Sequence, residues 1–224
     1  MNYLEIAQRS VLEGGASGRG VSIAGASGEW LRFVTWVNQA WQDIQNEHSG
    51  SWLWMRKTKS FPTVTEQGEY ALSDLSITDF ASWHQDSFRV YKDTVGNETY
   101  LPYLPYNMFR DIYLISNVST TYSMPSVMTI SPIKSIVLAL PPNDASYVIT
   151  GDYQSTPAKL TLDADTPAMP ERFHMAIVWK ALMYYAAYES YPEKYSTAER
   201  EYKRIRNQLE IDQLPEITIN RSFL

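Results

Sequence analysis

Residues 170–188 form the stretch that most limits how this chain can fold. From residue 173 onward, only His174 and Lys180 are clearly polar. A surface helix carries one apolar stripe, whereas a helix that is apolar nearly all round is buried in a core or an interface. Pro170 suits a first helical position, and Glu171 then suits the positive end of the helix dipole. The sequence therefore predicts a helix of roughly 28 Å that other helices surround.

The composition describes a globular protein and excludes several kinds of site. Hydrophobic residues make up 44% and charged residues 20% of the 224 residues, which is typical of a folded domain. Cysteine is absent, which excludes disulfides, thiolate zinc sites and cysteine nucleophiles, and three histidines disfavour a histidine metal centre. No apolar run reaches the roughly 18 residues of a membrane span, and the N-terminal pattern is not that of a signal peptide. We therefore expect synthesis in a reducing cytoplasm and no membrane partner.

The charge balance limits how the chain can meet nucleic acid. The formal net charge is -6 and the sequence pI is about 5.1. Tight binding to DNA requires basic side chains that neutralise phosphates, so we expect at most a surface past which DNA slides. Sixteen tyrosines, seven tryptophans and seven phenylalanines are available instead. Aromatic side chains of this kind are enriched in buried protein interfaces.

Apolar residues at helical spacing mark both ends of the chain. Residues 2–13, 29–47 and 192–209 are predicted helices, with Ser27 as the expected N-cap of the second. The stripes that should face the core are Trp30, Val34, Val37, Trp41 and Ile44 in the second helix and Tyr195, Ala198, Tyr202, Ile205 and Leu209 in the last. The glycine-rich residues 14–28 lack the spacing of a phosphate-binding loop, and no strand precedes them. We interpret them as a flexible loop.

The middle of the chain has the short period of β-strands. Predicted strands cover residues 56–61, 68–73, 87–92, 99–103, 126–130, 135–140 and 146–153, with a hairpin turn at Gly96 and Asn97. Their closeness in sequence predicts an antiparallel meander. A short helix over residues 106–116 should direct Met108, Ile112 and Ile115 inward.

The predicted fold class is α+β. A helical bundle built from both chain ends, residues 1–54 and 159–214, carries an inserted antiparallel β-rich domain at residues 55–158. Residues 215–224 form a predicted extended C-terminal arm. This arm alternates apolar and polar residues like a strand, but it has no hairpin partner beside it. It therefore either folds back onto the sheet or pairs with another chain.

Catalytic motifs are absent from the sequence, and the best candidate cluster has a simpler explanation. Asp163, Asp165, Glu171 and His174 could together hold a divalent metal for a hydrolase. Alternatively, the aspartates shape a loop, Glu171 complements the helix dipole, and His174 borders the core. We favour this second interpretation, and we expect no enzyme activity, no metal and no cofactor.

Several segments resemble a family of tailed-bacteriophage adaptor proteins, also called head-to-tail connector or head-completion proteins. The segments that carry the resemblance are 170–189 (PERFHMAIVWKALMYYAAYE), 29–44, 51–56 (SWLWMR), 79–91, 101–106 (LPYLPY) and 213–217 (QLPEI). The resemblance implies a helical bundle with an inserted β-domain, similar to podophage tail tubular, or gatekeeper, proteins. It also implies a homo-oligomeric ring, of twelve copies in this family, in the virion neck.

In that position the ring would lie under the portal protein and hold a tail, nozzle or tail-fibre protein. Genomic double-stranded DNA would pass through its lumen without specific binding. An alternative is a glycan- or receptor-binding tail module that uses the aromatic-rich insert, with Trp83 as a binding residue.

Three sets of residues are expected to make contacts in such an assembly. Ile217, Ile219, Phe223 and Leu224 are the expected docking side chains of the arm, toward portal or tail. Tyr184, Tyr185 and Tyr188 are the expected subunit contacts, because a neighbouring copy could cover the extra apolar side of the helix. Arg56, Lys57 and Lys59 are a candidate for weak contact with DNA or a partner, or else a solvated strand face.

Overall fold

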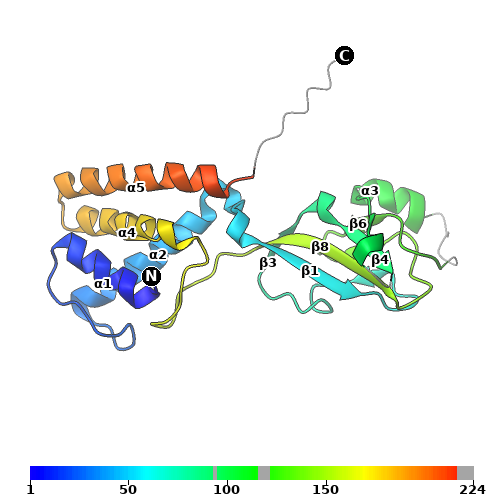
Figure 1. Ribbon diagram of the computed structural model, residues 1–224, viewed down its shortest axis with the longest axis horizontal. Coiled ribbons are helices and arrows are strands. Elements are labelled where there is room, and N and C mark those ends of the chain that lie inside the picture. Colours follow the sequence, from blue (N-terminus) through cyan, green and yellow to red (C-terminus); the bar gives the residue numbers. More distant parts are fainter. Residues whose placement is uncertain (93–94, 116–121, 216–224) are drawn as a thin grey trace, which may run out of the picture. The chain divides into compact units, whose positions relative to one another are not determined.

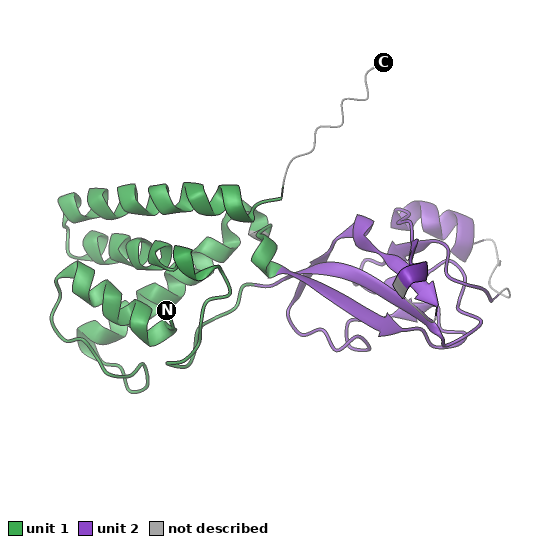
Figure 2. Cartoon of the chain, viewed as in Figure 1, with its two compact units in different colours: residues 1–55, 157–224 green, residues 56–156 purple. Residues whose placement is uncertain are grey.

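The computed structural model describes residues 1–92, 95–115 and 122–215 of the chain. These residues form two compact units, a helical unit (Met1–Met55 with Pro157–Leu224) and a β unit (Arg56–Thr156). Figure 2 shows that the helical unit is made from both ends of the chain and the β unit from its middle. Helices and antiparallel sheets occur together, and the predicted α+β class is therefore confirmed.

In the helical unit, three other helices pack around one apolar helix, α4 (Met175–Tyr188) (Figure 1). These are α1 (Tyr3–Gly14), α2 (Gly28–Asn46) and α5 (Pro192–Gln213), and all three pack against α4. The short helices η1 (Glu47–Gly50), η2 (Leu53–Met55) and η6 (Glu171–Phe173) complete the unit. The predicted surrounded helix is confirmed, although its first turn is the 3-10 helix η6 and the α-helix begins at Met175.

Local sequence explains where the first two helices begin. Asn2 and Glu5 form a capping box at the start of α1, in which each side chain bonds the backbone of the other. Ser27 is the N-cap residue of α2, as predicted, but its side chain makes no capping hydrogen bond. Gly28, with φ of 59°, takes the first position of α2, and this left-handed conformation suits glycine.

The core of the helical unit follows the predicted stripes with one exception. All five predicted residues of α2 are buried, as are Ala198, Tyr202, Ile205 and Leu209 of α5. Tyr195 was expected on the same stripe of α5 but is exposed. Burying each large apolar side chain stabilises the unit by roughly 1.5–3 kcal/mol.

Residues 158–160, which follow the β unit in the sequence, are bonded to α2 by the amide side chains of Asn38 and Gln45. Asn38 accepts from the Leu160 amide at 3.2 Å and donates to the Leu160 carbonyl at 2.9 Å. Gln45 makes the same pair of bonds with Ala158, at 2.8 and 2.9 Å. Each amide replaces the backbone partner that an extended segment would find in a sheet, so the N–H and C=O groups of Ala158 and Leu160 are both paired beside a helix.

The β unit contains two antiparallel sheets. The larger sheet has the order β1 (Arg56–Pro62), β8 (Tyr147–Ser155), β4 (Arg89–Lys92) and β5 (Thr99–Tyr100), and β3 (Phe80–Trp83) also pairs with β8. The smaller sheet has the order β2 (Glu69–Tyr70), β7 (Ile136–Leu138) and β6 (Met128–Ile130). The short helices of this unit are η3 (Gln85–Ser87), η4 (Val95–Asn97), α3 (Tyr106–Phe109) and the π-helix η5 (Arg110–Leu114).

The expected meander is wrong for the larger sheet. Its last strand in sequence, β8, lies at the centre and pairs with β1 on one side and with β4 and β3 on the other. The residues of β8 alternate between buried and half-buried over most of its length. A long strand of this kind satisfies its backbone on both edges only in a central position. Only the β4–β5 hairpin follows the predicted order, with Gly96 and Asn97 between its strands.

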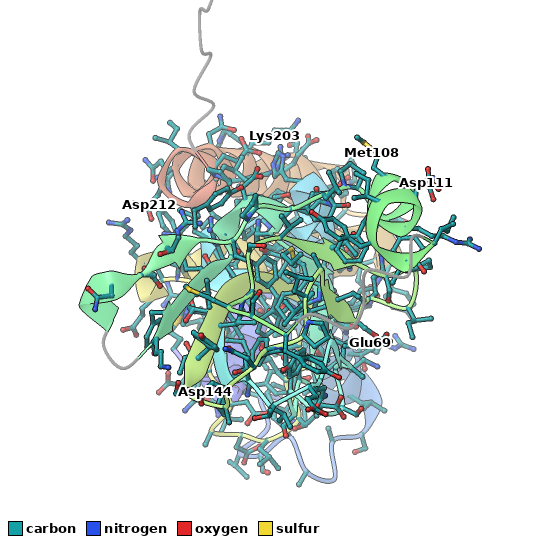
Figure 3. The ribbon with its side chains drawn as sticks, turned by 90° about the vertical axis from the view of Figure 1, so that its right-hand side faces the viewer. Glu69, Met108, Asp111, Asp144, Lys203 and Asp212 are labelled. Carbon is teal, nitrogen blue, oxygen red and sulfur yellow. The ribbon has the colours of Figure 1, made fainter. Side chains whose placement is uncertain are left out.

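The helix formed by α3 and η5 is oriented opposite to the prediction. Met108, Ile112 and Ile115 were expected to face inward, but they are 54%, 47% and 64% exposed. Phe109 is the residue that is fully buried. Figure 3 shows Met108 and Asp111 on the outer side of this helix. Phe109 is thus the side chain that anchors this helix in the β unit, while the apolar stripe of the helix faces solvent.

Candidate assembly surfaces

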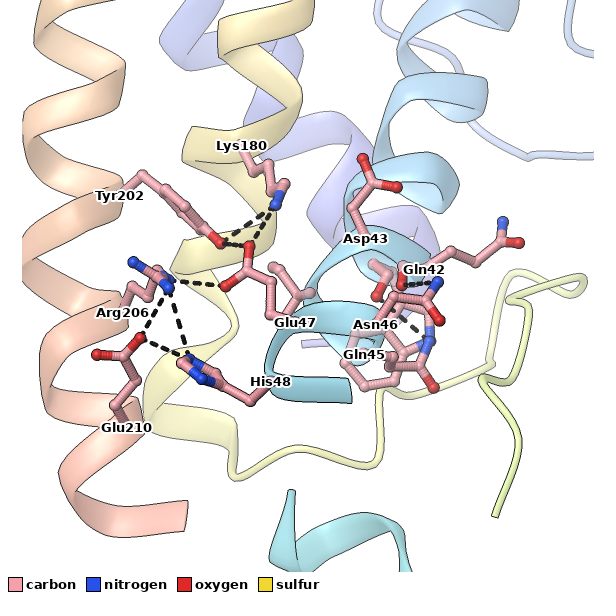
Figure 4. Close-up of polar contacts among 12 residues, drawn as sticks. Gln42, Asp43, Gln45, Asn46, Glu47, His48, Lys180, Tyr202, Arg206 and Glu210 are labelled. Atoms are coloured by element: carbon pink, nitrogen blue, oxygen red, sulfur yellow. Dashed lines mark hydrogen bonds and ion pairs between the residues drawn. The ribbon is translucent and has the colours of Figure 1, made fainter. Parts of the chain in front are cut away.

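A polar network connects the end of α2 to α4 and α5, and Glu47 is its centre (Figure 4). The Glu47 Oε1 atom accepts from Lys180 Nζ at 2.6 Å and from the Tyr202 hydroxyl at 2.5 Å. Its Oε2 atom accepts from Arg206 Nε at 2.7 Å. The side chains of Lys180 and Glu47 are only 15% and 20% exposed, so the pair is largely shielded from water. The network therefore holds three helices together through one carboxylate.

The ionisation of the network follows from these contacts. Burial alone would raise the pKa of Glu47, but the hydrogen bonds from Lys180, Tyr202 and Arg206 and the Lys180 charge outweigh it and lower that pKa. Burial and the bond to Glu47 raise the pKa of Tyr202, which keeps its hydroxyl a donor. Glu47 is thus ionised, and its partners supply the donors that it needs.

The residues after Glu47 leave the helix through a strained turn. His48 and Ser49 have φ angles of 53° and 56°, in the left-handed region that side chains rarely adopt. His48 Nε2 lies 2.7 Å from Glu210 Oε1, and the His48 ring packs edge-on against Trp52. Trp52 in turn donates to the Ile44 carbonyl at 2.7 Å. These contacts fix the path of the chain as it leaves α2.

The three tyrosines expected at a subunit contact lie in different environments. Tyr185 is 6% exposed and packs on Phe33 inside its own unit. Tyr184 is half-buried and donates its hydroxyl to Asp43, and burial followed by the Asp43 contact raises its pKa. Tyr188 is 53% exposed, and the Arg32 guanidinium lies 4.2 Å from its ring centre. Tyr188 is therefore the most exposed of the three tyrosines.

A groove lies where the end of α1 meets the turn between α4 and α5; we call it the corner groove. It consists of two adjoining pockets of about 340 and 450 Å³ that share Glu193 and Lys194. Its apolar lining comes from Trp179, Leu182, Tyr185, Tyr191 and Ala198. Lys194 donates to the Gly14 carbonyl and lies 5.6 Å from the ring centres of both Tyr185 and Tyr191.

The candidate metal residues serve as structural ties. Asp165 accepts from the amides of Thr161 and Leu162, and the Asp163 carboxylate accepts from the Ile23 amide at 2.7 Å. The described part of the chain contains no group of three or more acidic or histidine side chains arranged to hold a metal.

Glu171 and His174 are directed to the N-terminus of the chain. The Met1 amino group lies 2.7 Å from Glu171 Oε1 and 3.0 Å from His174 Nδ1. The other ring nitrogen of His174 lies 3.0 Å from the Met169 carbonyl and donates to it. His174 is almost fully buried, as a residue that borders the core should be.

Acidic neighbours partly neutralise the basic group on β1. Arg56 pairs with Asp152 at 2.6 Å, and Lys57 pairs with Asp79 at 2.6 Å. Lys59 is half-buried, and no ion pair is found for it within the described ranges. These pairs leave little free positive charge for phosphates.

Two further expectations concern the arm and the insert. Ile217, Ile219, Phe223 and Leu224 lie outside the described residues. Trp83, the residue expected to bind a glycan, is buried between Phe80 and Phe88, and its Nε1 atom donates to the Lys134 carbonyl at 2.9 Å. It therefore offers no open ring face for a sugar.

Sequence reasoning missed the Glu47 network and the corner groove. Glu47 and Arg206 are 159 residues apart, and neither belongs to a motif. Lys194 belongs to no motif either. One pattern in the sequence does indicate the Glu47 network, namely a polar residue within an otherwise apolar helix. Lys180 in α4 is the clearest case.

Comparison with known proteins identifies the family. No helix within the described residues is long and apolar enough to cross a membrane. A search of curated proteins finds no match to the chain. The family model described as SU10 adaptor protein matches residues 1–220, which is almost the whole chain. The chain therefore belongs to the SU10 adaptor protein family, whose members are structural adaptor proteins of bacteriophage virions.

Proposed function

We propose that this protein forms a ring under the portal of a tailed phage, extends the DNA channel and joins the head to the tail, without catalysis. The match to the adaptor family over residues 1–220 carries the proposal. The number of copies, twelve by the resemblance, and the portal and tail partners are part of the proposal. So is the location in the virion neck.

Exposed apolar side chains on both units support an assembly role. Those of the helical unit include Leu12, Val21, Tyr188 and Tyr191, and those of the β unit include Met108, Ile112, Ile115 and Ile133. Single exposed apolar residues are common on monomers, but a short helix that turns an apolar stripe outward is typical of a surface that a partner covers. An acidic chain with paired basic residues also suits a channel wall that does not retain DNA.

Mass photometry of the purified chain with the purified portal protein of the same phage tests this function. We expect a stoichiometric complex whose added mass corresponds to about twelve copies, the ring size that the resemblance implies, in a ring closed by cyclic symmetry. The chain alone can remain monomeric under the proposal, since the portal provides the template. Absence of a complex with the portal at high concentration of both proteins would contradict it.

A matched pair of variants then tests the subunit contact. Tyr188→Ala should weaken ring formation on the portal because Tyr188 offers an exposed aromatic ring at the end of α4. Ile211→Ala removes an apolar side chain that is 87% exposed near the end of α5, and it serves as the control. Equal assembly by the two variants would remove Tyr188 from the interface.

A further inference from the structure

We propose that the corner groove of one copy binds the apolar end of residues 216–224 from a neighbouring copy. The inference rests on the proposed function, because it requires copies to assemble side by side. The arm would then bind another copy within the ring, and not the portal or tail protein that the sequence led us to expect. The ligand is a short peptide with a basic residue followed by large apolar ones, and Arg221, Phe223 and Leu224 supply this pattern.

The shape and lining of the groove fit such a peptide. Its two pockets lie within the size range of sites that bind small ligands. Tyr191 is about half exposed at one side, while Leu182 and Ala198 form a buried apolar floor. Lys194, which is held by the Gly14 carbonyl and two tyrosine rings, does not need to move to admit a ligand. An apolar side chain therefore finds a preformed surface.

The charges around the groove favour a basic partner. Glu193 lines both pockets, and no hydrogen bond or ion pair engages its side chain among the residues described. Glu189 stands at the end of α4 near Tyr185, where its charge contributes to raising the pKa of that tyrosine. Glu13 is paired with Arg9, and the Lys194 ammonium already has a carbonyl partner. The charges left over are carboxylates, and Arg221 complements them.

The length of the chain indicates that the arm comes from another copy. The helical rise from Lys194 to Gln213 along α5 amounts to about 29 Å. Fully extended, the chain from Pro215 to Phe223 also spans at most about 29 Å. A copy's own Phe223 would reach the level of Lys194 only as a straight line. It would reach the level of Ala198, about 22 Å from Gln213, with little length left to turn back and enter the groove. A neighbouring copy has no such restriction.

The free edge of the larger sheet is a poorer site for the arm. β1 is the edge strand next to β8, and it carries Lys57, Lys59 and, at its end, Pro62. Lysines and proline on an edge strand discourage the addition of a further strand. This observation argues against the alternative in which the arm pairs with the β1 edge of its own chain.

Cysteine cross-linking tests the proposal with little background, because the natural chain contains no cysteine. One preparation carries Ser222→Cys in the arm, and a second preparation of different mass tag carries Thr197→Cys at the exposed rim of the groove. The two are mixed, assembled on purified portal and oxidised. We expect a covalent dimer of the two tags, with about tenfold more product than the controls because docking raises the effective concentration of the thiols.

Controls separate the other sites for the arm. Lys203→Cys places a thiol further along α5, outside the groove, and Ser60→Cys places one on β1. A chain that carries both Ser222→Cys and Thr197→Cys tests closure within one copy. Glu193→Lys in the groove chain reverses the unpaired charge and should lower the yield severalfold, while circular dichroism stays that of the parent.

The outcomes distinguish this inference from the function on which it rests. Stronger cross-linking to Ser60→Cys, equal cross-linking to Lys203→Cys, closure within one copy, or cross-linking to the portal through added portal cysteines would each overturn the inference. If the portal complex forms and the groove pair gives no product, the adaptor function stands and the inference fails. If no portal complex forms, the function itself has failed.

Discussion

Arg206 in α5 donates to Glu47 at the end of α2 across 2.7 Å, although 159 residues separate them in the sequence. The same carboxylate receives Lys180 of α4. One side chain thus connects the part of the helical unit that precedes the β unit to the part that follows it. The loss of this carboxylate should affect the stability of the whole helical unit.

Glu47→Ala should lower the free energy of unfolding by roughly 3 kcal/mol, because it leaves the shielded Lys180 without its carboxylate and leaves Arg206 with Glu210 alone. Thermal or urea unfolding of the full chain measures the effect. Glu199→Ala is the matched control, since its pair with Lys203 on α5 is exposed and should change stability by no more than about 0.5 kcal/mol. Equal stability of the two variants would show that the network contributes nothing beyond a surface pair.

Stability should decrease in mild acid because of His174. Burial lowers the pKa of His174 below its usual 6.5, with the Met1 amino charge adding to the effect, although the bonds to Met169 and Met1 and the Glu171 charge act in the opposite direction. The unfolded chain therefore takes up this proton at a higher pH than the folded chain. The contribution of neutral His174 to the free energy of unfolding is fully present above pH 6.5, the usual pKa of histidine. It is lost as the pH falls from there through the lowered pKa of the folded state.

Urea unfolding at about pH 7.5 and about pH 5.5 measures this dependence, since His titrates between these values. His174→Gln keeps a donor for the Met169 carbonyl but removes the titrating group, and we expect a smaller difference between the two pH values. A His174→Gln variant with an unchanged pH dependence would contradict the assignment.

Gly151→Ala should destabilise the β unit. A Cβ atom at Gly151 in β8 would overlap the ring of Phe88, which is fully buried. Overpacking of this kind costs roughly 1–3 kcal/mol. Gly96→Ala is the control, because nothing lies within 4 Å of its Cβ position. The melting temperatures of the two variants should differ clearly, and similar values would mean that Phe88 moves aside at little cost.

The outward stripe of the helix formed by α3 and η5 can be tested by substitution. Phe109→Ala removes the buried anchor and should cost roughly 3–5 kcal/mol. Ile112→Ser removes an exposed apolar residue and should change stability by less than about 0.5 kcal/mol. Chemical unfolding of both variants decides between the observed orientation and the inward one that the sequence suggested. A large loss for Ile112→Ser would favour the inward one.

Deletion of residues 216–224 should leave the folded chain intact and weaken assembly. The described residues of the helical unit already bury the apolar helix α4 among themselves, so the melting temperature should change little. Assembly on the portal, measured by mass photometry, should require a higher concentration of the truncated chain. An unfolded truncated chain by circular dichroism would place the segment within the domain's own structure.

Local patterns predicted the helices well because helical contacts are close in sequence. The stripe from Trp30 to Ile44 and the apolar α4 both followed from a spacing of three and four residues. Strand neighbours are not local, and the central position of β8 could not be read from residues next to it. The orientation of Ile112 failed for a different reason, since a stripe shows which residues share a face but not whether the chain or a partner covers it.

For the candidate sites too, contacts between residues close in sequence could be predicted and contacts between distant residues could not. The turn role of Asp165 was favoured from its neighbours, and its bonds to Thr161 and Leu162 agree with that. The partners of Lys180 come from α2 and α5, and no pattern within α4 indicates them. Pairings between distant segments depend on the packed fold, so only the structure reveals them.

The pairing of Arg56 with Gln154 means that the β unit leaves and re-enters the helical unit at neighbouring points. A segment whose two ends are side by side can be replaced, lengthened or removed with a short connection, at a closure cost that grows only slowly with its length. The helical unit can then remain unchanged while different inserts are exchanged at the same position. A family built in this way can keep one helical unit and vary the module inserted into it.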